Sequence, residues 1–193
     1  MKRTLRYITT TIAACILLSS TGSAQTVQNT QTTQTEQTAQ MAQPYKAYLE
    51  EIGYQKFILI SKDELTLKLI DKDGALIKEY GISCSKYYGN KEKRGDNKTP
   101  EGTFKINQLL NARGLSHDFG DGKGKIPNAY GPWFLRLNVP GFNDIGIHGT
   151  HLPESIGTRA TEGCIRLKNE DIIDLKGRVA LGTPVIILPD KVQ

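Results

Sequence analysis

The sequence predicts a mainly β domain, either a sandwich or a barrel, with a few short helices. Short apolar or alternating segments bounded by Gly, Pro, Asn or charged turn residues recur along most of the chain, a pattern typical of β-strands. Helical patterns are confined to residues 44–53 and 169–179. The chain has 193 residues, of which 38% are hydrophobic and 23% charged. This is enough apolar material for one core, and too little charge for a disordered or coiled-coil protein.

The first 24 residues have the three-part order of a secretory signal peptide. Three basic residues precede an apolar stretch over residues 8–18, and small polar residues follow as far as Ala24. The apolar stretch is too short to span a bilayer comfortably. We expect cleavage after Ala24, export, and no membrane span in the mature chain. A retained anchor and lipidation at Cys15, which lies inside the apolar stretch, are the alternatives.

A polar linker is predicted next. Residues 25–43, QTVQNTQTTQTEQTAQMAQ, are nearly all Gln, Thr, Asn and Ala, with Glu36 as the one charge. They lack the apolar surface needed to offset the entropy of ordering. We expect a disordered Gln/Thr-rich linker, followed by a folded domain over residues 44–193.

The predicted domain starts with a helix and continues mainly in strands. Pro44 is a helix-start residue and Gly53 a helix-end residue, so a short helix is expected between them. Charged turns then separate three segments that predict a β-meander, at residues 54–61, 65–71 and 76–84. Further strands are expected at residues 102–108, 131–137, 144–148 and 182–188. The long, polar, glycine-rich stretch 107–130 predicts a lid or the wall of a substrate groove.

A second helix is expected late in the chain. Asn169 is placed to cap it, and Glu170 and Asp171 fall in its first turn, where the helix dipole favours acids. Its predicted apolar face consists of Ile172, Ile173, Leu175 and Val179.

The net charge argues against nucleic acid as a partner. The chain has 25 Lys and Arg against 20 Asp and Glu, a formal charge of +5. Removal of the predicted signal peptide takes away Lys2, Arg3 and Arg6 and no acid, which leaves a charge of +2. Attraction to an anionic polymer is then left to local patches such as residues 86–95, where a solvated loop is the ordinary interpretation.

Two cysteines remain in the expected mature chain. Cys84 ends an apolar segment, where a small buried thiol is the ordinary interpretation. Cys164 lies in the polar sequence GTRATEGCIRLKNED and is a candidate nucleophile. A disulfide between the two is the alternative for an exported protein.

His148 is the best candidate base for Cys164. It stands at the end of a predicted strand, and the carbonyl of Gly149 is free to accept one ring N–H and fix the tautomer. A neighbouring imidazole and a nearby cation would lower the pKa of the thiol. Gly163 permits a tight turn before the thiol, with the amides of Gly163 and Cys164 free to stabilise an oxyanion.

Three separated motifs carry a family resemblance. The segment IGIHGTHLPESIGTRATEGCIRLKNEDIIDL resembles the signature of the L,D-transpeptidase catalytic domain (YkuD) family, a His in HG[TS] followed by [ST]-x-G-C-[IV]-R. GDNKTPEGTFKI, residues 95–106, is similar to the family's G-D-x-x-T-P-x-G-x-F segment, and LGTPVIIL to its closing strand. The resemblance covers about residues 54–188 and implies a β-sandwich-like catalytic domain.

The resemblance implies roles for individual residues. Cys164 would be the nucleophile, His148 the base and Gly149 the group that orients His148. Substrate-binding residues would be Thr150, Thr161, Gly163 and Arg166. This chain has Glu162 where many members have His, so the resemblance implies nothing about that position. Arg166 would bind a substrate carboxylate, with an ion pair to Glu170 or Asp171 as the structural alternative.

The implied reaction belongs to the bacterial periplasm or cell envelope. Cys164 would attack a tetrapeptide stem of peptidoglycan, release D-Ala, and pass the acyl group to an acceptor. The acceptor is left open between a second stem, a lysine of a wall-attached protein, and water, which would make the enzyme a carboxypeptidase or hydrolase. A non-catalytic wall-binding module is the alternative from another class. No cofactor is implied, and no metal, since His148 and His151 lack the i, i+4 helical spacing of a zinc site.

Overall fold

The computed structural model describes residues 53–120 and 122–191 and, before them, residues 36, 40, 43, 45–47 and 49–51. The predicted signal peptide lies outside the described residues, as does most of the predicted linker. Within that linker Glu36, Gln40 and Gln43 are helical, so helical residues precede the predicted domain start at residue 44. The helices in the described part of the chain include none that is long and apolar enough to cross a membrane.

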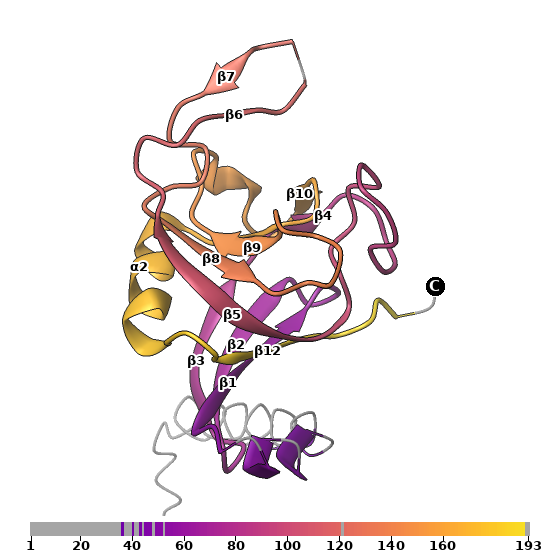
Figure 1. The fold of residues 1–193 in the computed structure, drawn as a ribbon, viewed down its shortest axis with the longest axis vertical. Coiled ribbons are helices and arrows are strands. Elements are labelled where there is room, and N and C mark those ends of the chain that lie inside the picture. Colours follow the sequence, from indigo (N-terminus) through magenta and orange to yellow (C-terminus); the bar gives the residue numbers. More distant parts are fainter. Residues whose placement is uncertain are drawn as a thin grey trace, which may run out of the picture. The chain divides into compact units, whose positions relative to one another are not determined.

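An eight-stranded sheet curls around the core (Figure 1). Its strand order is β11 (Ile165–Arg166), β9 (Gly146–His148), β8 (Trp133–Leu137), β5 (Gly102–Asn111), β12 (Pro184–Ile187), β1 (Lys56–Ser61), β2 (Thr66–Asp71) and β3 (Leu76–Gly81). Two small sheets pair β4 (Cys84–Ser85) with β10 (Arg159–Thr161), and β6 (His117–Asp118) with β7 (Lys125–Ile126). Two helical elements follow the strands of the first half of the chain, the 3-10 turn η1 (Pro153–Ser155) and the helix α2 (Asn169–Arg178). The prediction of a mainly β domain with few short helices is confirmed.

The N-terminal meander is present, and its centre is completed from the other end of the chain. Strands β1, β2 and β3 pair antiparallel in sequence order, as predicted. Strand β1 also pairs in parallel with β12, in the register Ile58 to Val185 and Ile60 to Ile187. The strands that come first and last in the sequence are therefore neighbours in the middle of the sheet.

Strand β5 joins the two halves of the curled sheet. Its first residues pair with β12, and the residues from Ile106 onwards pair with β8. The register shifts between Ile106 and Gln108, and such a bulge bends a strand and increases its twist. Because β5 continues to Asn111, the expected loop 107–130 begins as a strand, and its irregular part starts at Ala112.

The core follows the two-residue period of the strands. In β1, Ile58 and Ile60 point into the main buried cluster, which includes residues of β2, β5, β8, β9, β11 and β12. The intervening Phe57 and Leu59 pack on the other face against Leu49, which comes from the expected N-terminal helix. That helix ends as predicted at Gly53, whose φ is +69°.

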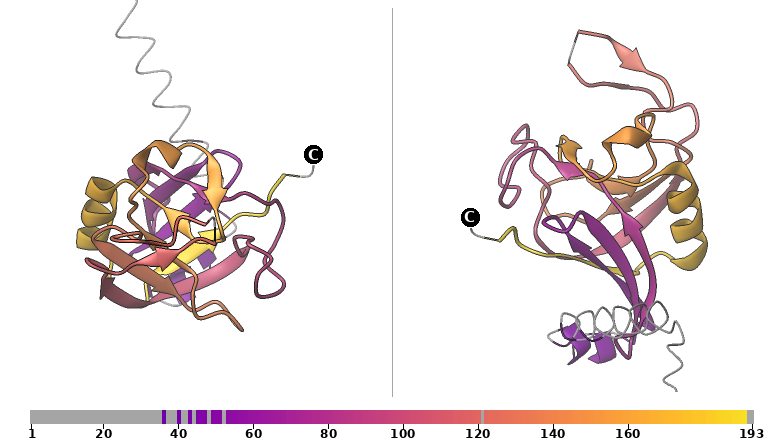
Figure 2. Two further views of the ribbon diagram at one scale, coloured as in Figure 1. Left: turned by 90° about the horizontal axis from the view of Figure 1, so that it is seen from above. Right: turned by 180° about the vertical axis from the view of Figure 1, so that it is seen from behind.

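Helix α2 packs on the same core but differs from its prediction in two ways (Figure 2). Ile172 and Leu175 are fully buried, whereas Ile173 is 48% exposed, so it does not belong to the apolar face. Asn169 does not cap the helix, because Lys168 is the N-cap and makes no side-chain cap bond. The Asn169 side chain instead accepts the backbone N–H of Thr150 at 2.9 Å.

Candidate active site

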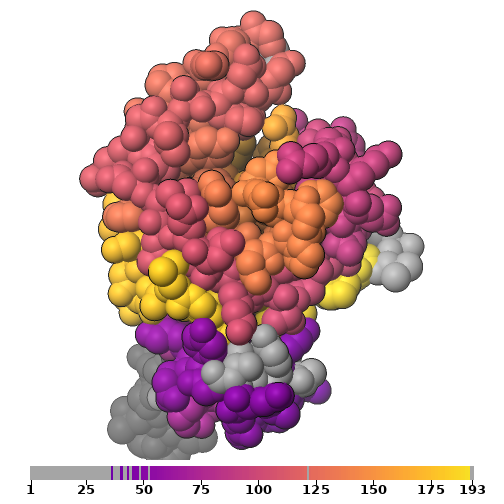
Figure 3. Space-filling model, viewed as in Figure 1, coloured from indigo at the N-terminus to yellow at the C-terminus, as the bar shows by residue number. Residues whose placement is uncertain are grey.

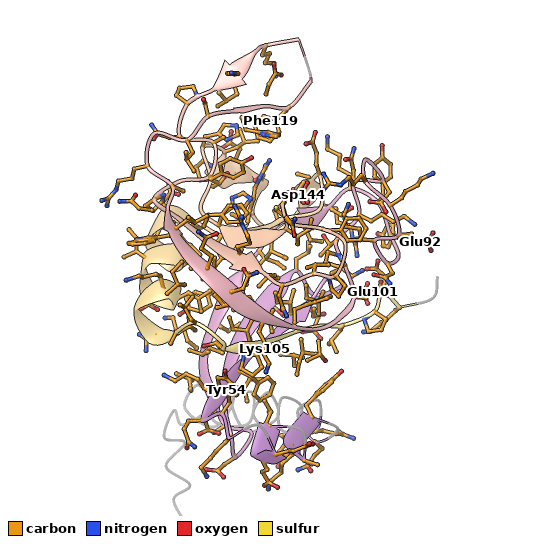
Figure 4. All side chains as sticks on the ribbon, in the orientation of Figure 1. Tyr54, Glu92, Glu101, Lys105, Phe119 and Asp144 are labelled. Atoms are coloured by element: carbon orange, nitrogen blue, oxygen red, sulfur yellow. The ribbon has the colours of Figure 1, made fainter. Side chains whose placement is uncertain are left out.

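A cavity of about 180 Å³ contains both Cys164 and His148 in its lining. One wall is the loop of residues 86–98, which contributes Lys91 and Arg94, and the opposite wall is the segment 112–131. Figure 3 shows the surface hollowed between these two walls. Figure 4 shows Phe119 at the foot of the β6–β7 hairpin and Asp144 beneath it, and both line the cavity. The loop that was expected to be a groove wall therefore lies at the predicted site.

The curled sheet brings the candidate nucleophile and base together. Strands β9 and β11 run parallel, with Arg166 opposite His148 and Ile165 opposite Ile147. Cys164 directly precedes β11 and so falls opposite Gly146, two residues before His148. Since alternate residues of a strand face the same side, Cys164, Arg166 and His148 share one face of this strand pair.

The His148 ring is held on three sides. Its Nδ1 lies 2.6 Å from the carbonyl oxygen of Gly149, the bond expected from the sequence. The Phe134 ring stacks on it with an interplanar angle of 6°, and the Tyr130 ring meets it edge-on at 5.0 Å. Because a carbonyl can only accept, Nδ1 carries the proton and Nε2 is left as the basic atom. Burial lowers the pKa of His148 to about 3, so the ring is neutral at physiological pH.

Two glycines allow this packing. A Cβ at Gly146 would clash with the Phe134 ring and lie 2.7 Å from the carbonyl oxygen of Leu135. A Cβ at Gly149 would clash with the Asn169 side chain and lie 2.9 Å from Pro132. Neither position has room for a larger residue, so both are needed for the rigid setting of His148.

The pKa of the Cys164 thiol is shifted in the direction opposite to the one expected from the sequence. The thiol is half-buried and donates to the backbone oxygen of Asp144 at 3.3 Å. Burial raises its pKa to about 11, although Arg166 and Lys91 act in the opposite direction. The expected lowering of the thiol pKa is therefore wrong for the free protein, since the cost of burying a thiolate outweighs the nearby cations.

The turn before Cys164 is braced by Thr161. The Thr161 hydroxyl donates to the Cys164 carbonyl at 2.6 Å and accepts the Gly163 N–H at 3.2 Å. Gly163 has a φ of +125°, and a Cβ there would lie 2.7 Å from the Lys98 carbonyl oxygen. The expected tight turn is present, but the Gly163 amide is occupied and is not free to stabilise an oxyanion.

Arg166 is buried in the cavity wall. It is 5% exposed, and its Nε has no hydrogen-bond partner in the part of the chain that the structure describes. The alternative of an ion pair with Glu170 or Asp171 does not occur among these residues; the guanidinium instead lies 5.4 Å from the centre of the Phe119 ring. Burial lowers the pKa of Arg166 from 12.5. The guanidinium remains charged and can attract an anion into the cavity.

Thr150 does not line this cavity. Its backbone N–H is bound to Asn169, and its hydroxyl accepts the N–H of Leu152 at 2.9 Å. The residue borders a separate open hollow with His151 and Arg113. The sequence implied a substrate contact, and the structure shows a buried residue that fixes the chain after Gly149.

Several residues of the cavity were not singled out from the sequence. His117 was assigned to a polar loop, but its Nδ1 lies 2.9 Å from the Tyr130 hydroxyl and its Nε2 3.5 Å from Glu162. Phe119 packs edge-on against His117 at 4.5 Å. The contact between His117 and Glu162 joins residues 45 positions apart, and no local sequence pattern indicates it.

Cys84 does not line the cavity. Cys84 is fully buried on β4, and both cysteines are free thiols, so the alternative of a disulfide is not present. Burial raises the pKa of Cys84 to about 11. The described residues contain no cluster of three or more His, Cys, Asp or Glu side chains that could hold a metal ion.

Comparison with known proteins identifies the family. The sequence model of the L,D-transpeptidase catalytic domain family, YkuD, matches residues 55–187 of this chain. The chain belongs to the YkuD family. A Bacillus licheniformis protein assigned as an L,D-transpeptidase, YkuD, is 33% identical over 133 residues, which cover 68% of this chain and 65% of that protein. The matched part thus spans just under two thirds of that YkuD relative.

Solved structures support the YkuD fold. An L,D-transpeptidase from Mycobacterium smegmatis superposes with a TM-score of 0.51 at 20% identity, covering 69% of this chain and 58% of that one. L,D-transpeptidase 3 from Mycobacterium tuberculosis, in complex with a faropenem-derived adduct, gives 0.52 at 18% identity, covering 69% and 60%. The curled β architecture is therefore that of an L,D-transpeptidase catalytic domain.

Proposed function

We propose that the chain is a cysteine-dependent peptidoglycan L,D-transpeptidase. Its substrate is a tetrapeptide stem, from which it releases D-Ala and transfers the acyl group to an amine. The observation that carries the proposal is the placement of the Cys164 thiol and the neutral His148 ring in one cavity of a YkuD domain. No cofactor takes part.

The protonation states define how the thiol would be activated. In the free protein both groups are neutral, because burial raises the pKa of Cys164 to about 11 and lowers that of His148 to about 3. A standing thiolate and imidazolium pair is therefore disfavoured. The proton moves to His148 Nε2 as the sulfur attacks, after the thiol leaves its hydrogen bond to the Asp144 carbonyl.

The reaction then proceeds in two acyl transfers. Cys164 attacks the carbonyl of the third stem residue, a diamino acid; the amide C–N bond breaks, and His148 returns its proton to the departing D-Ala amine. The thioester carbonyl next meets an acceptor amine. The new C–N bond forms, the C–S bond breaks, and the proton lost by the amine returns to the sulfur through His148.

Gly149 and Arg166 have supporting roles in this proposal. The carbonyl of Gly149 holds the Nδ1–H tautomer at 2.6 Å, which keeps Nε2 basic. The buried guanidinium of Arg166 attracts a stem carboxylate into the cavity. Thr161 and Gly163 act through the shape of the turn that presents Cys164.

The chain organisation completes the proposal. Residues 1–24 act as a signal peptide removed after Ala24, residues 25–43 as a linker, and residues 44–193 as the catalytic domain. Export then places the enzyme in the periplasm or cell envelope, where its substrate is.

The test follows acylation of Cys164 and its products. Purified protein is incubated with a tetrapeptide stem, and separately with faropenem, and adducts are located by peptide mass spectrometry. We expect one acyl group on Cys164, none in Cys164→Ala, and an adduct retained in the matched control Cys84→Ala. Absence of any adduct from the wild-type protein would refute the proposal.

Product analysis distinguishes the remaining alternatives. Cross-linked or amine-linked products mark a transpeptidase, whereas a free tripeptide stem alone marks a carboxypeptidase that uses water. If the protein is a wall-binding module, it forms no adduct, and the Cys164→Ala variant binds cell walls with the same affinity as the wild type.

A further inference from the structure

Glu162 places a carboxylate in the cavity two residues before the candidate nucleophile. Its side chain is 40% exposed and lines the same cavity as Cys164 and His148. One oxygen, Oε2, lies 3.5 Å from His117 Nε2. In the described ranges of the chain Glu162 has no other salt-bridge or hydrogen-bond partner, so Oε1 is available to a ligand.

The carboxylate is held by a chain of contacts that ends at His148. When His117 carries its proton at Nε2, that N–H points at Glu162. Nδ1 then accepts a hydrogen bond from the Tyr130 hydroxyl, over a distance of 2.9 Å. The Tyr130 ring in turn packs edge-on against His148 at 5.0 Å. His117 is therefore a positioning residue that directs Glu162 toward the wall formed by segment 112–131.

The other charged residues of the cavity carry a positive charge or, in the case of Asp144, lack the contact with a histidine that Glu162 makes. Lys91 is paired with Asp96 at 2.8 Å, and Arg94 and Arg166 supply positive charge suited to the carboxylates of a stem peptide. Asp144 lines the cavity too and is exposed, with its backbone oxygen accepting the Cys164 thiol. Glu162 is thus the acid that is anchored next to the turn bearing the thiol.

An acceptor amine reaches the enzyme in its protonated form, since alkyl amines titrate well above neutral pH. A carboxylate at the cavity mouth attracts such an ammonium group, whereas it offers nothing comparable to water. We propose that Glu162 is the acceptor-specificity residue of this enzyme: it binds the ammonium group of the incoming amine and favours transfer over hydrolysis. The bound ammonium releases one proton to solvent before the free amine attacks the thioester, and the second proton passes through His148 to the sulfur. This inference rests on the proposed transpeptidase function and names the chemical class of its acceptor.

The test compares two amine acceptors that differ in charge. Nα-acetyl-lysine amide carries one ammonium and no carboxylate at neutral pH, whereas hydroxylamine is an uncharged nucleophile. The variant Glu162→Gln keeps the size of the side chain and removes the charge. We expect its KM for Nα-acetyl-lysine amide to rise about fivefold, in line with the loss of one partly exposed ionic contact. Its KM for hydroxylamine should stay unchanged.

A second variant and a control define the role of the charge. Glu154→Gln removes the same charge from an exposed position on η1, outside the cavity lining, and should leave both KM values unchanged. Glu162→Lys should raise the ratio of hydrolysis to amine transfer further than Glu162→Gln.

The outcomes separate this inference from the proposed function. Equal changes in KM for both acceptors, or no change for either, would overturn the role of Glu162 while stem acylation of Cys164 remains intact. Absence of stem acylation in the wild type would instead overturn the proposed function, and this inference with it.

Discussion

Alkylation of Cys164 by iodoacetamide should be slow at neutral pH and should accelerate steadily as the pH is raised. The reagent reacts with thiolates, and burial raises the pKa of this thiol from 9.0 to about 11. At pH 7 the thiolate fraction is then about a hundredfold smaller than for a cysteine of ordinary pKa. A thiolate of higher pKa is more nucleophilic, by about tenfold for a difference of this size. The net expectation is a rate about tenfold below that of an unstructured cysteine peptide.

The assay measures the extent of labelling against time from pH 5 to pH 10, with peptide mass spectrometry assigning the site. Cys84 provides an internal reference, because it is fully buried and should remain unlabelled while the protein is folded. The logarithm of the Cys164 rate should rise by about one for each pH unit, since the thiolate fraction rises tenfold. His148→Ala should leave this slope unchanged.

A plateau in the rate between pH 5 and pH 8 would refute the reasoning. It would mean that a thiolate and imidazolium pair already exists in the free protein, as in enzymes whose thiol is activated before the substrate binds. Loss of that plateau in His148→Ala would then show that the imidazolium stabilises the thiolate.

Three further predictions concern the stability of the site and its walls. Lys62→Met should lower the free energy of unfolding by about 3 kcal/mol in urea denaturation, because the fully buried ammonium pairs with Asp190 at 2.9 Å. Gly146→Ala should cost about 1–3 kcal/mol, and should slow acylation by displacing the Phe134 ring that stacks on His148. Asp96→Asn should make the loop of residues 86–98 more sensitive to limited proteolysis. Burial opposes ionisation of Asp96, but the hydrogen bond from Lys91 and three backbone N–H bonds hold its pKa below 3.8, so its contribution is present above about pH 4 and lost as the pH falls.

Matched variants show whether these effects come from the stated contacts. Lys78→Met removes an exposed lysine of β3 and should leave stability within about 0.5 kcal/mol of the wild type. Gly177 lies in α2, where an added Cβ would meet no other heavy atom within 4 Å, so Gly177→Ala should be neutral or stabilising by up to about 1 kcal/mol. If Lys62→Met and Lys78→Met were equally stable, the buried ion pair would not contribute. Resistance of Asp96→Asn to proteolysis equal to that of the wild type would remove the role of its hydrogen bonds.

Local patterns in the sequence predicted most of the strands. The apolar alternation of β1 and β2 and the charged turns between them were sufficient to place the meander. The same patterns could not reveal that β5 continues past residue 108 to Asn111, since the bulge after Ile106 depends on pairing with β8 and β12. Nor could they show that Ile173 faces solvent, because an apolar residue next to a buried stripe has the same local pattern.

The candidate site was predictable where the residues are close to a motif, and not where it depends on distant contacts. Cys164, His148 and the hydrogen bond to Gly149 follow from short segments of sequence. The raised pKa of the thiol depends on burial, which the sequence does not show. The contact between His117 and Glu162 depends on how the segment 112–131 folds over the cavity, and no spacing rule relates the two residues.

The parallel pairing of β1 with β12 has a consequence for how the chain is made. Residues 58–60 find their partners at residues 185–187, so the middle of the sheet stays open until residues 185–187 have been synthesised. Until then the meander presents an apolar edge that can pair with other chains. Pairings this far apart in sequence form slowly, because a long loop must close before they contribute. Deletion of the last ten residues should therefore prevent folding altogether and leave an aggregating chain, even though Cys164 and His148 are both retained.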